Sequence, residues 1–418
     1  MTRSLKCVVL SALVIACAAC GGDSSEPQVL HVPSPEWRDQ VIYMLFIDRF
    51  DDGNPANNDQ GLGEFDPAKG THFSGGDLQG VIDRLDYIQS LGATAVWISP
   101  PVANQWWSTP YSATGWHGYW AVHFKEVDKH FGSLADYRHL SDELHRRGMY
   151  LIQDIVANHT GNFFTYDSGY DPTDTAKNFR LLEEGTDQPA PEQYPFNLID
   201  RLNPEHAEAD VYHWTPQVID YADRYQELNY SMGHLSDINT ANPLVIQTLK
   251  ESYRFWIDEV GVDGFRVDTA ILVEHEFWRR FLHDDDGIYA HAKDAGKSHF
   301  LTFGEVTSVS DPYEDSGEVM VSSYIGDEGG PLFNSMLGYP LYSDIKNVIA
   351  YGTPTEHLAY RMQKFMDAYP DPFVIPNFVD NHDTPRFLSA GHGAALRQAL
   401  ALLFTIPGIQ TIYQGNEQ

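Results

Sequence analysis

Residues 264–270 read GFRVDTA, an apolar run that contains one arginine and is followed by an aspartate. If this run is a β-strand, its side chains alternate between two faces, so Arg266 and Asp268 lie on the same face. Such a pair either ties a strand end to its surroundings or belongs to a functional site. The heptapeptide by itself is compatible with both interpretations.

Apolar, β-branched runs of the same kind recur along the chain, and each ends in polar residues. They cover residues 41–50, 94–100, 150–159, 262–268, 300–305, 373–383 and 409–415, and we predict a further strand near 331–342. Helical patterns lie between several of them, as at 134–148 and 243–261. Strands that alternate with helices indicate parallel βαβ units.

The spacing of the strand ends favours a closed barrel. A (β/α)₈ barrel needs roughly 30 residues per unit, and Asp268 and Glu305 are about one unit apart. Asp154 and Asp268 are much further apart, so an insertion must follow the third strand. We therefore predict an α/β fold, a (β/α)₈ TIM barrel formed by residues 36–159 and 236–418, with an inserted domain at 160–235. The polar residues lie at the C-terminal strand ends, where barrel enzymes carry their chemistry.

The first residues have the pattern of a secretory signal peptide, which we assign to residues 1–19. Small residues before Cys20 and the polar GGDSSE after it resemble a bacterial lipoprotein processing site. Cys17 is a competing site, and ordinary signal-peptidase cleavage is the plainer alternative. We expect a secreted protein, anchored by lipid at the cell envelope, with residues 20–35 as a linker.

Charge and cysteine content limit the function further. The formal net charge is −32, which makes nucleic acid and anionic membrane surfaces poor partners. A neutral substrate and cation binding are compatible with it. The three cysteines, Cys7, Cys17 and Cys20, all lie in the N-terminal segment. Disulfides and cysteine catalysis in the folded part are therefore excluded.

Four motifs resemble, in order and spacing, the conserved regions of the α-amylase family, glycoside hydrolase family thirteen. They are DIVANH (154–159), GFRVDTA (264–270), GEV (304–306) and FVDNHD (378–383), and HLSDINTANP (234–243) resembles the fifth region. The chain is most similar to bacterial α-amylases and cyclodextrin glucanotransferases. It stops at IYQGNEQ, just after the eighth expected strand, so the usual C-terminal β-domain is absent from it.

The resemblance implies three catalytic carboxylates. Asp268 corresponds to the nucleophile, Glu305 to the general acid/base, and Asp383 to the carboxylate that fixes substrate hydroxyls. Retaining hydrolysis requires such an acid and nucleophile about 5 Å apart. We expect the cation of Arg266 to keep Asp268 ionised.

Further side chains match positions of the family that bind substrate, since sugar rings stack on aromatic rings and sugar hydroxyls bind polar groups. They are His117, Tyr119, His159 and His382, together with Arg266. Trp106 and Trp107 either line the same cleft or pack in the core.

Oxygen-bearing side chains in DDGNPANN (51–58) are suited to Ca²⁺, although such a stretch also fits a solvated turn. The candidate ligands are Asp52, Asn54, Asn57 and Asn58. A resemblance to the calcium loop of cyclodextrin glucanotransferases adds Gly75 and Asp77. A second site resembles the calcium shared across the family and would use Asn158, Asp237 and the backbone carbonyl of Leu272.

Two departures from the family pattern affect the expected reaction. Cyclodextrin glucanotransferases carry Phe or Tyr where this chain has Gly233, and many members have Lys-His where it has Ile271 and Leu272. We therefore expect a retaining hydrolase of α-1,4-glucosidic bonds in starch and maltooligosaccharides, active as a monomer. A transglycosylase, or a cyclodextrin-degrading amylase, is the close alternative. A non-catalytic glucan-binding lipoprotein is a third.

Overall fold

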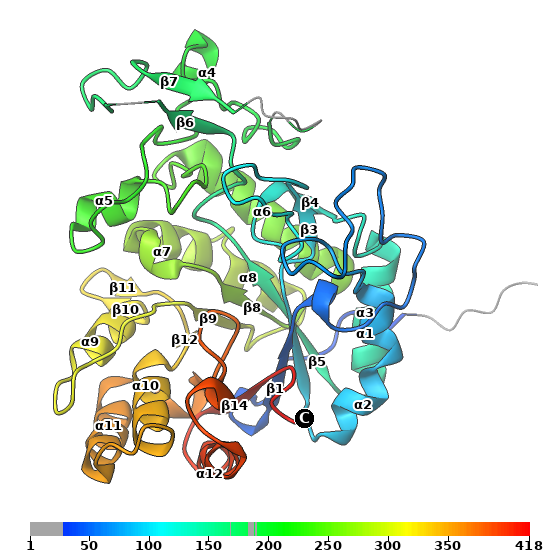
Figure 1. Ribbon diagram of the computed structural model, residues 1–418, viewed down its shortest axis with the longest axis vertical. Helices are drawn as coiled ribbons and strands as arrows, with labels where there is room; N and C mark the ends of the chain where they lie inside the picture. Colours follow the sequence, from blue (N-terminus) through cyan, green and yellow to red (C-terminus); the bar gives the residue numbers. More distant parts are fainter. Residues whose placement is uncertain (1–27, 168, 183–187, 189) are drawn as a thin grey trace, which may run out of the picture.

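The computed structural model describes residues 28–167, 169–182, 188 and 190–418 (Figure 1). The predicted signal peptide and both candidate lipidation sites, Cys17 and Cys20, lie outside the described residues. Within the described ranges, no helix is both long enough and apolar enough to cross a membrane.

Eight parallel strands form a nearly closed barrel, as the sequence predicted. They are β1 (Val41–Leu45), β2 (Ala95–Ile98), β5 (Tyr150–Ile155), β8 (Gly264–Val267), β9 (Leu301–Gly304), β12 (Ser335–Met336), β13 (Pro376–Asn377) and β14 (Ile409–Tyr413). The order around the sheet is β12-β9-β8-β5-β2-β1-β14-β13. Between β12 and β13 the barrel is closed by loop contacts, because Ser335 Oγ donates to the Val374 carbonyl at 2.6 Å and Gly338 N to the Pro376 carbonyl at 3.0 Å.

Two predicted strands are shorter than expected. The run 373–383 contributes only the two residues of β13, preceded by the 3₁₀ helix η4 (Pro372–Val374). Pro376 has no N–H group for a ladder hydrogen bond, which limits strand pairing here. The run 331–342 divides between β11 (Gly330–Pro331), β12 and a helix that begins at Tyr339.

Helices surround the barrel. They are α1 (Leu78–Asp83), α2 (Leu85–Ser90), α3 (Leu134–Arg146), α6 (Pro243–Val260), α7 (His275–His283), α8 (Ile288–Asp294), α9 (Ser316–Ser323), α10 (Tyr339–Ile349), α11 (Thr355–Ala368) and α12 (Gly393–Leu403). Both helices predicted from the sequence are present. Ser133 and Asp136 form a capping box at the start of α3. Gly261, in the left-handed region with φ +75°, ends α6.

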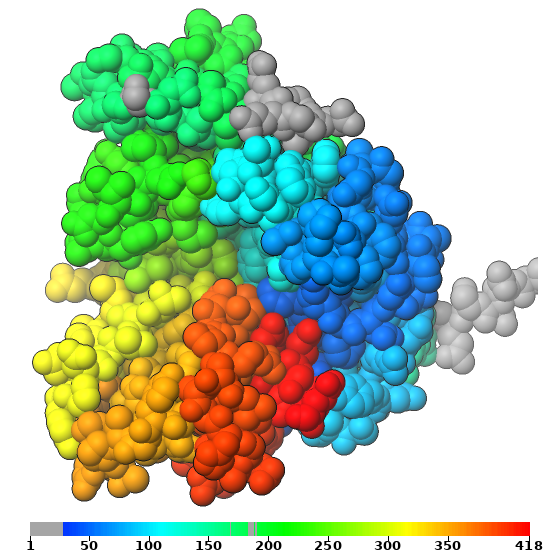
Figure 2. Space-filling model, in the orientation of Figure 1, coloured from blue at the N-terminus to red at the C-terminus, as the bar shows by residue number. Residues whose placement is uncertain are grey.

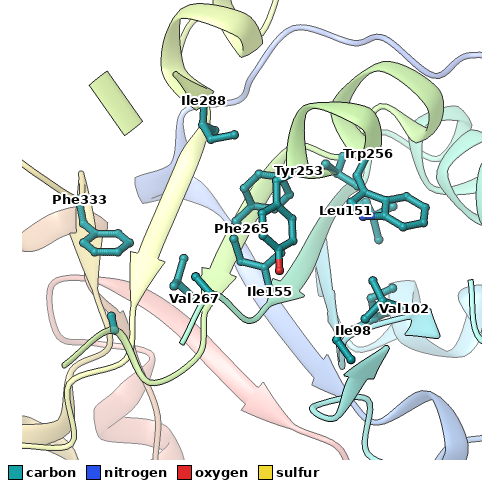
Figure 3. Close-up of a cluster of buried hydrophobic side chains, with 14 of the residues drawn as sticks. Ile98, Val102, Leu151, Ile155, Tyr253, Trp256, Phe265, Val267, Ile288 and Phe333 are labelled. Carbon is teal, nitrogen blue, oxygen red and sulfur yellow. The ribbon is translucent and has the colours of Figure 1, made fainter. Parts of the chain in front are cut away.

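Alternating side chains divide the core of the barrel into an outer and an inner layer. Phe265 and Val267 of β8 point outward, and Figure 3 shows them with Tyr253 and Trp256 of α6 in one apolar cluster. Arg266, between them in the sequence, therefore points into the barrel. A second cluster, which contains Ile42, Met44, Trp97, Ile152 and Phe303, fills the inside.

The chain between β5 and α6 leaves the barrel. It contains the antiparallel pair β6 (Phe164–Tyr166) and β7 (Phe179–Leu181), and the helices α4 (Pro204–Ala209) and α5 (Arg224–Asn229). In Figure 1, β6, β7 and α4 lie at the end of the molecule opposite α11 and α12. The exact boundaries of the inserted domain, 160 and 235, remain a prediction.

Smaller elements complete the fold. The antiparallel pair β3 (Val102–Asn104) and β4 (Ala121–Val127) precedes α3, and β10 (Gly326–Asp327) pairs with β11. Four further 3₁₀ helices are η1 (Trp37–Asp39), η2 (Ile47–Arg49), η3 (Ala270–Leu272) and η5 (Phe387–Ser389). The loop after β1 packs on the loop after β3, where Thr114 N donates to the Thr71 carbonyl at 2.9 Å (Figure 2).

The end of the predicted linker packs along the barrel. The Val29 carbonyl lies 2.6 Å from His145 Nδ1, and Lys297 Nζ donates to the Val32 carbonyl at 3.3 Å. The imidazole of His145 and the ammonium group of Lys297 also contact the buried carboxylate of Asp263. Residues 28–32 are therefore held on the barrel surface.

Candidate active site

The buried Arg266 joins the C-terminal ends of three neighbouring strands. Its Nη1 donates to Asp154 Oδ1 at 2.9 Å and to Asp268 Oδ1 at 3.0 Å, and its Nη2 lies 2.8 Å from Glu305 Oε2. Asp383 is more distant, with Oδ2 3.8 Å from Nη2. Arg266 and Asp268 are thus part of a cluster of carboxylates around one guanidinium, and they do more than attach the end of a strand to its surroundings.

The sheet itself brings these residues together. Asp154 of β5 is the register partner of Arg266 in β8, and β9 pairs with β8 on the other side. Asp268 N donates to the Ile155 carbonyl at 2.9 Å and Glu305 N to the Val267 carbonyl at 2.9 Å, so the ladder continues past the strand ends. Parallel strands place their C-terminal ends at one edge of the barrel, which is why four separate motifs meet.

Burial opposes the charge that Arg266 supplies. It raises the pKa of Asp154 to about 6 and that of Asp268 to about 7, although the guanidinium lowers both values. Desolvation by the surrounding protein and the charge of Glu305 also raise the pKa of Asp383, although 44% of its side chain is exposed at the cleft. Arg266 acts on Asp268 in the expected direction, because it lowers the pKa of this carboxyl group, but one cation is shared by three carboxylates and burial has the larger effect.

Three histidines beside the cluster lie in surroundings that favour their neutral form. Burial lowers the pKa of His117 to about 3 and that of His159 to about 4, and burial together with Arg266 lowers the pKa of His382 well below its usual value. His159 Nε2 and His382 Nδ1 are buried and have no hydrogen-bond partner among the described residues. Neutral imidazoles with free ring nitrogens can bind hydroxyl groups.

Tyr119 connects these histidines to the carboxylates. Its hydroxyl donates to Asp154 Oδ2 at 2.9 Å and lies 3.0 Å from His382 Nε2. The rings of Tyr119 and His382 are nearly parallel, 5.9 Å apart at 5°. The Tyr119 backbone N–H donates to His117 Nδ1 at 3.0 Å.

A cleft of about 720 Å³ opens over the cluster. Its lining includes the three predicted catalytic carboxylates and the predicted substrate-binding residues His117, Tyr119, His159 and His382. Aromatic side chains form much of the rest: Phe46, Tyr111, Trp116, Trp120, Tyr221 and Tyr413. A cleft with convergent polar groups and aromatic walls suits a sugar chain.

Trp106 and Trp107 are not part of the lining of this cleft. Their rings pack against each other at 6.4 Å, and Trp107 packs edge-on against His72 at 5.6 Å. Neither side chain belongs to the lining of the cleft or to the two buried hydrophobic clusters of the described residues, and His72 holds Trp107 against the loop after β1. A count of aromatic residues could not distinguish them from Tyr111 on the same loop.

Gly233 has a structural reason to be glycine. Its φ is +59°, and a Cβ atom there would overlap the hydroxyl of Tyr111. That hydroxyl accepts a hydrogen bond from His234 N at 2.8 Å, and the Tyr111 ring stacks on Trp120 at 5.2 Å and 25°. An aromatic ring from another loop therefore occupies the place next to Gly233, which the sequence pattern did not reveal.

The loop predicted to bind calcium contains buried oxygen atoms that need a partner. Asn57 Oδ1 and Asn58 Oδ1 have no hydrogen-bond partner within the described part of the chain. Asn58 Nδ2 donates to Asp52 Oδ2 at 2.7 Å, and a Cβ on Gly75 would lie 2.6 Å from the same nitrogen. Unpartnered amide oxygens next to a carboxylate fit a hard cation.

Asp77 and Asn54 are adjacent to this group. Asp77 Oδ2 accepts from Asn54 N at 2.8 Å, and Oδ1 caps α1 by accepting from Gly80 N at 2.7 Å. Burial raises the pKa of Asp77, and the negative charge of Asp52 adds to this effect. A bound cation would favour the ionised carboxylate, so these residues also fit the predicted site.

The second predicted calcium site lies where the inserted segment meets the barrel. Ile238 N donates to the Asn158 carbonyl at 2.9 Å, which places Asp237 beside the end of β5. Burial raises the pKa of Asp237 to about 6, and its Oδ2 lies 2.6 Å from His213 Nδ1. His213 therefore supplies one polar partner that the sequence interpretation missed. Leu272, the third predicted ligand, ends η3 after β8 and borders the cleft.

An eight-stranded parallel barrel with a carboxylate cluster in an aromatic cleft at its C-terminal strand ends is the architecture of a barrel glycosidase. Residues 44–418 match the family model described as "Alpha amylase, catalytic domain", and the chain belongs to the α-amylase family.

Its similarity extends to characterised relatives. The cyclomaltodextrin glucanotransferase of Klebsiella oxytoca is 30% identical over 432 residues, which cover 94% of this chain and 60% of the relative. That of Bacillus sp. strain 1-1 is also 30% identical and is covered over 49% of its length. The chain thus spans about half to three fifths of these relatives.

Solved structures show the same barrel. A cyclomaltodextrin glucanotransferase with a three-domain ABC distribution has a TM-score of 0.75 at 28% identity, over 91% of this chain and 72% of that one. The α-amylase of Geobacillus thermoleovorans, solved with acarbose, has a TM-score of 0.67 at 30% identity, over 91% of this chain and 71% of that one.

Proposed function

We propose that the protein is a retaining glycosidase that cleaves α-1,4-glucosidic bonds in starch and maltooligosaccharides. One observation carries the proposal: neighbouring nitrogens of the Arg266 guanidinium hold Asp268 and Glu305 at the cleft. A shared guanidinium keeps two carboxylates close, as expected for the short spacing of a retaining pair. The anomeric configuration of the first products, followed by NMR, tests it, and α-configured products are expected.

In the proposed reaction, Glu305 donates its proton to the glycosidic oxygen while Asp268 attacks the anomeric carbon. The bond to the leaving oxygen breaks and a glycosyl ester forms on Asp268. Glu305 then takes a proton from water, and the resulting attack on the anomeric carbon releases Asp268. Asp383, His159 and His382, which line the cleft, bind sugar hydroxyls and hold the ring in place.

A transglycosylase is the second candidate, and the named relatives favour it, since several are cyclomaltodextrin glucanotransferases. Transfer requires that a sugar acceptor replace water in the second step. Gly233 supplies no ring for such an acceptor, but Tyr111 places one next to it. The balance between hydrolysis and transfer therefore depends on whether the Tyr111 ring holds an acceptor sugar.

We expect linear maltooligosaccharides from soluble starch, with cyclodextrins at most a trace product. The reason is that residue 233 contributes no ring that would hold a sugar acceptor in place of water at the glycosyl ester. Chromatography of early digests is the measurement. Cyclodextrins as the main early product would establish the transglycosylase instead.

Tyr111 is the residue to vary in this experiment, because Gly233→Tyr would have to adopt φ +59° and overlap Tyr111. Tyr111→Ala should raise KM for maltooligosaccharides about 2- to 10-fold through the lost stacking surface. Tyr111→Phe keeps the ring and is the matched control. It should keep the KM of the wild type.

We also propose that Ca²⁺ binds at the loop after β1 and at the junction with the inserted segment. The first site would use Asp52, Asn54, Asn57, Asn58, Gly75 and Asp77, and the second Asn158, Asp237 and Leu272. The cation would neutralise buried carboxylates and hold loops for which the chain has no disulfide.

Chelation should therefore lower the melting temperature, and Ca²⁺ should restore it. Calcium at one hundred times its Kd stabilises a single site by about 2.7 kcal/mol. Asn58→Ala should weaken this response, because Asn58 Oδ1 is buried without a partner in the described structure. Asp59→Asn changes an exposed carboxylate of the same loop that is not a predicted ligand, and it should respond as the wild type does. Equal melting temperatures in chelator and in excess Ca²⁺ would rule out both sites.

A further inference from the structure

Tyr339, the first residue of α10, contacts the proposed acid/base directly. Its hydroxyl donates to Glu305 Oε1 at 2.8 Å, and its side chain is buried. No motif of the sequence identified this residue. It follows β12 and enters the inside of the barrel from the strand next to β9.

The direction of this hydrogen bond is determined by a neighbour. Asn381 Nδ2 donates to the Tyr339 hydroxyl oxygen at 3.2 Å. The amide of Asn381 is itself oriented, because its Oδ1 accepts from the backbone N–H of Asp383 at 3.1 Å. The hydroxyl oxygen of Tyr339 is therefore used as an acceptor, and its proton is left for Glu305.

The ring of Tyr339 is held by packing. It lies edge-on to Phe378 at 5.2 Å and to Tyr342 at 6.2 Å, within the apolar cluster inside the barrel. Burial raises the pKa of the Tyr339 hydroxyl well above its usual value, with the charges of Glu305 and Asp383 adding to the effect. The hydroxyl therefore keeps its proton throughout the range in which an enzyme works.

The two oxygens of Glu305 have different surroundings. Oε2 accepts from Thr269 N at 3.0 Å and lies 2.8 Å from Arg266 Nη2, whereas Oε1 faces Tyr339. Arg266 also binds Asp154 and Asp268, and Asp383 lies beside Glu305 with His382 Nε2 3.0 Å from its Oδ2. Among these charged and titratable groups, Tyr339 is a neutral donor that binds one oxygen of Glu305 and leaves the other to Arg266.

We propose that Tyr339 is a positioning residue for Glu305, which aims its carboxyl group at the glycosidic oxygen and stabilises the carboxylate left after proton transfer. The inference rests on the proposed role of Glu305. A hydrogen bond to a charged group is among the stronger ones in a protein, and here it strengthens as the charge develops. The hydroxyl therefore favours the step in which the proton leaves Glu305.

Tyr339→Phe removes one oxygen atom and keeps the packed ring. We expect kcat on unactivated maltooligosaccharides to fall about 10- to 100-fold, with KM changed less than about 2-fold. On α-maltotriosyl fluoride, whose leaving group needs little protonation, the first step should be far less affected. The alkaline limb of the pH profile should move to higher pH, because the ionised form of the acid loses a stabilising donor.

Tyr342→Phe is the matched control. Tyr342 lies on the same helix, stacks on Phe378 at 5.0 Å and 20°, and its hydroxyl accepts from Lys346 Nζ at 3.2 Å. Tyr342→Phe should leave the turnover of both substrates and the pH profile unchanged. Equal melting temperatures for Tyr339→Phe and the wild type confirm that the fold is kept.

If the role of Tyr339 were merely structural, Tyr339→Phe would lower turnover of both substrates to the same extent and leave the alkaline limb of the pH profile in place. This result would overturn the inference. Unchanged kcat on maltooligosaccharides would overturn it too. Glu305→Gln distinguishes a failure of the proposed function from a failure of the inference about Tyr339. If Glu305→Gln remains active, the proposed function fails. If Glu305→Gln is inactive and Tyr339→Phe behaves as the wild type, only the inference about Tyr339 fails.

Discussion

Asp268→Asn is expected to lower kcat on maltooligosaccharides on the order of 10⁴-fold or more, because the amide cannot form the glycosyl ester. Glu305→Gln should cost about 10²- to 10⁴-fold, since it removes the transferable proton. Neither change should unfold the protein. Burial already raises the pKa of Asp268 to about 7, so a neutral amide there is expected to keep or raise the melting temperature.

Azide makes the two roles distinguishable. In Asp268→Ala it can enter the space of the lost carboxylate and attack from that side, which gives a glycosyl azide of inverted configuration. In Glu305→Ala it replaces the second-step water and gives the retained configuration. Asp367→Asn, an exposed carboxylate on α11, is the control and should behave as the wild type. Near-normal turnover by Asp268→Asn or Glu305→Gln would refute the assignment of these two residues. A wild-type protein that binds glucan but shows no turnover would favour the binding-only alternative.

Arg266→Met should destabilise the fold by about 3–5 kcal/mol near pH 8, because it leaves buried carboxylates without their cation. It should also abolish turnover, since Arg266 holds both Asp268 and Glu305. Chemical denaturation at several pH values is the measurement. Arg280→Met, which removes a solvent-exposed pair with Asp284, is the control and should cost at most about 1 kcal/mol.

The pH dependence of this loss has a definite sign. Asp154 and Asp268 have folded-state pKa values of about 6 and about 7, above the unfolded value of roughly 3.9, and loss of the cation raises them further. The folded variant then holds more protons than the unfolded chain, so its stability falls as pH rises. The deficit should be small near pH 5 and large near pH 8, and Asp154→Asn in the variant should recover part of it. A variant that melts like the wild type at pH 8 would contradict the shared-cation description.

The barrel could be predicted from the sequence because its signals are local. Period-two alternation, β-branched runs and the helices between them are properties of short segments, and eight such runs at barrel spacing leave few other folds. The meeting of Asp268, Glu305 and Asp383 also follows, since parallel strands bring their C-terminal ends to one edge. The same reasoning failed for the length of β13, where Pro376 removes a ladder hydrogen bond.

Tertiary structure alone decided which side chains share a partner. The local pattern predicts that Arg266 and Asp268 share one face of a strand, but it does not predict that Asp154 and Glu305 use the same guanidinium as Asp268. The Tyr111 ring beside Gly233 and the Tyr339 hydroxyl on Glu305 are contacts between segments far apart in the chain. Such contacts depend on where loops turn in space, and on burial, which raises the pKa of Asp268 against the pull of its neighbouring cation. Neither the path of a loop nor the burial of a side chain is a property of a single segment. The sequence therefore determined the barrel and its catalytic edge, and the folded chain determined the electrostatics of the site and the contacts that position its side chains.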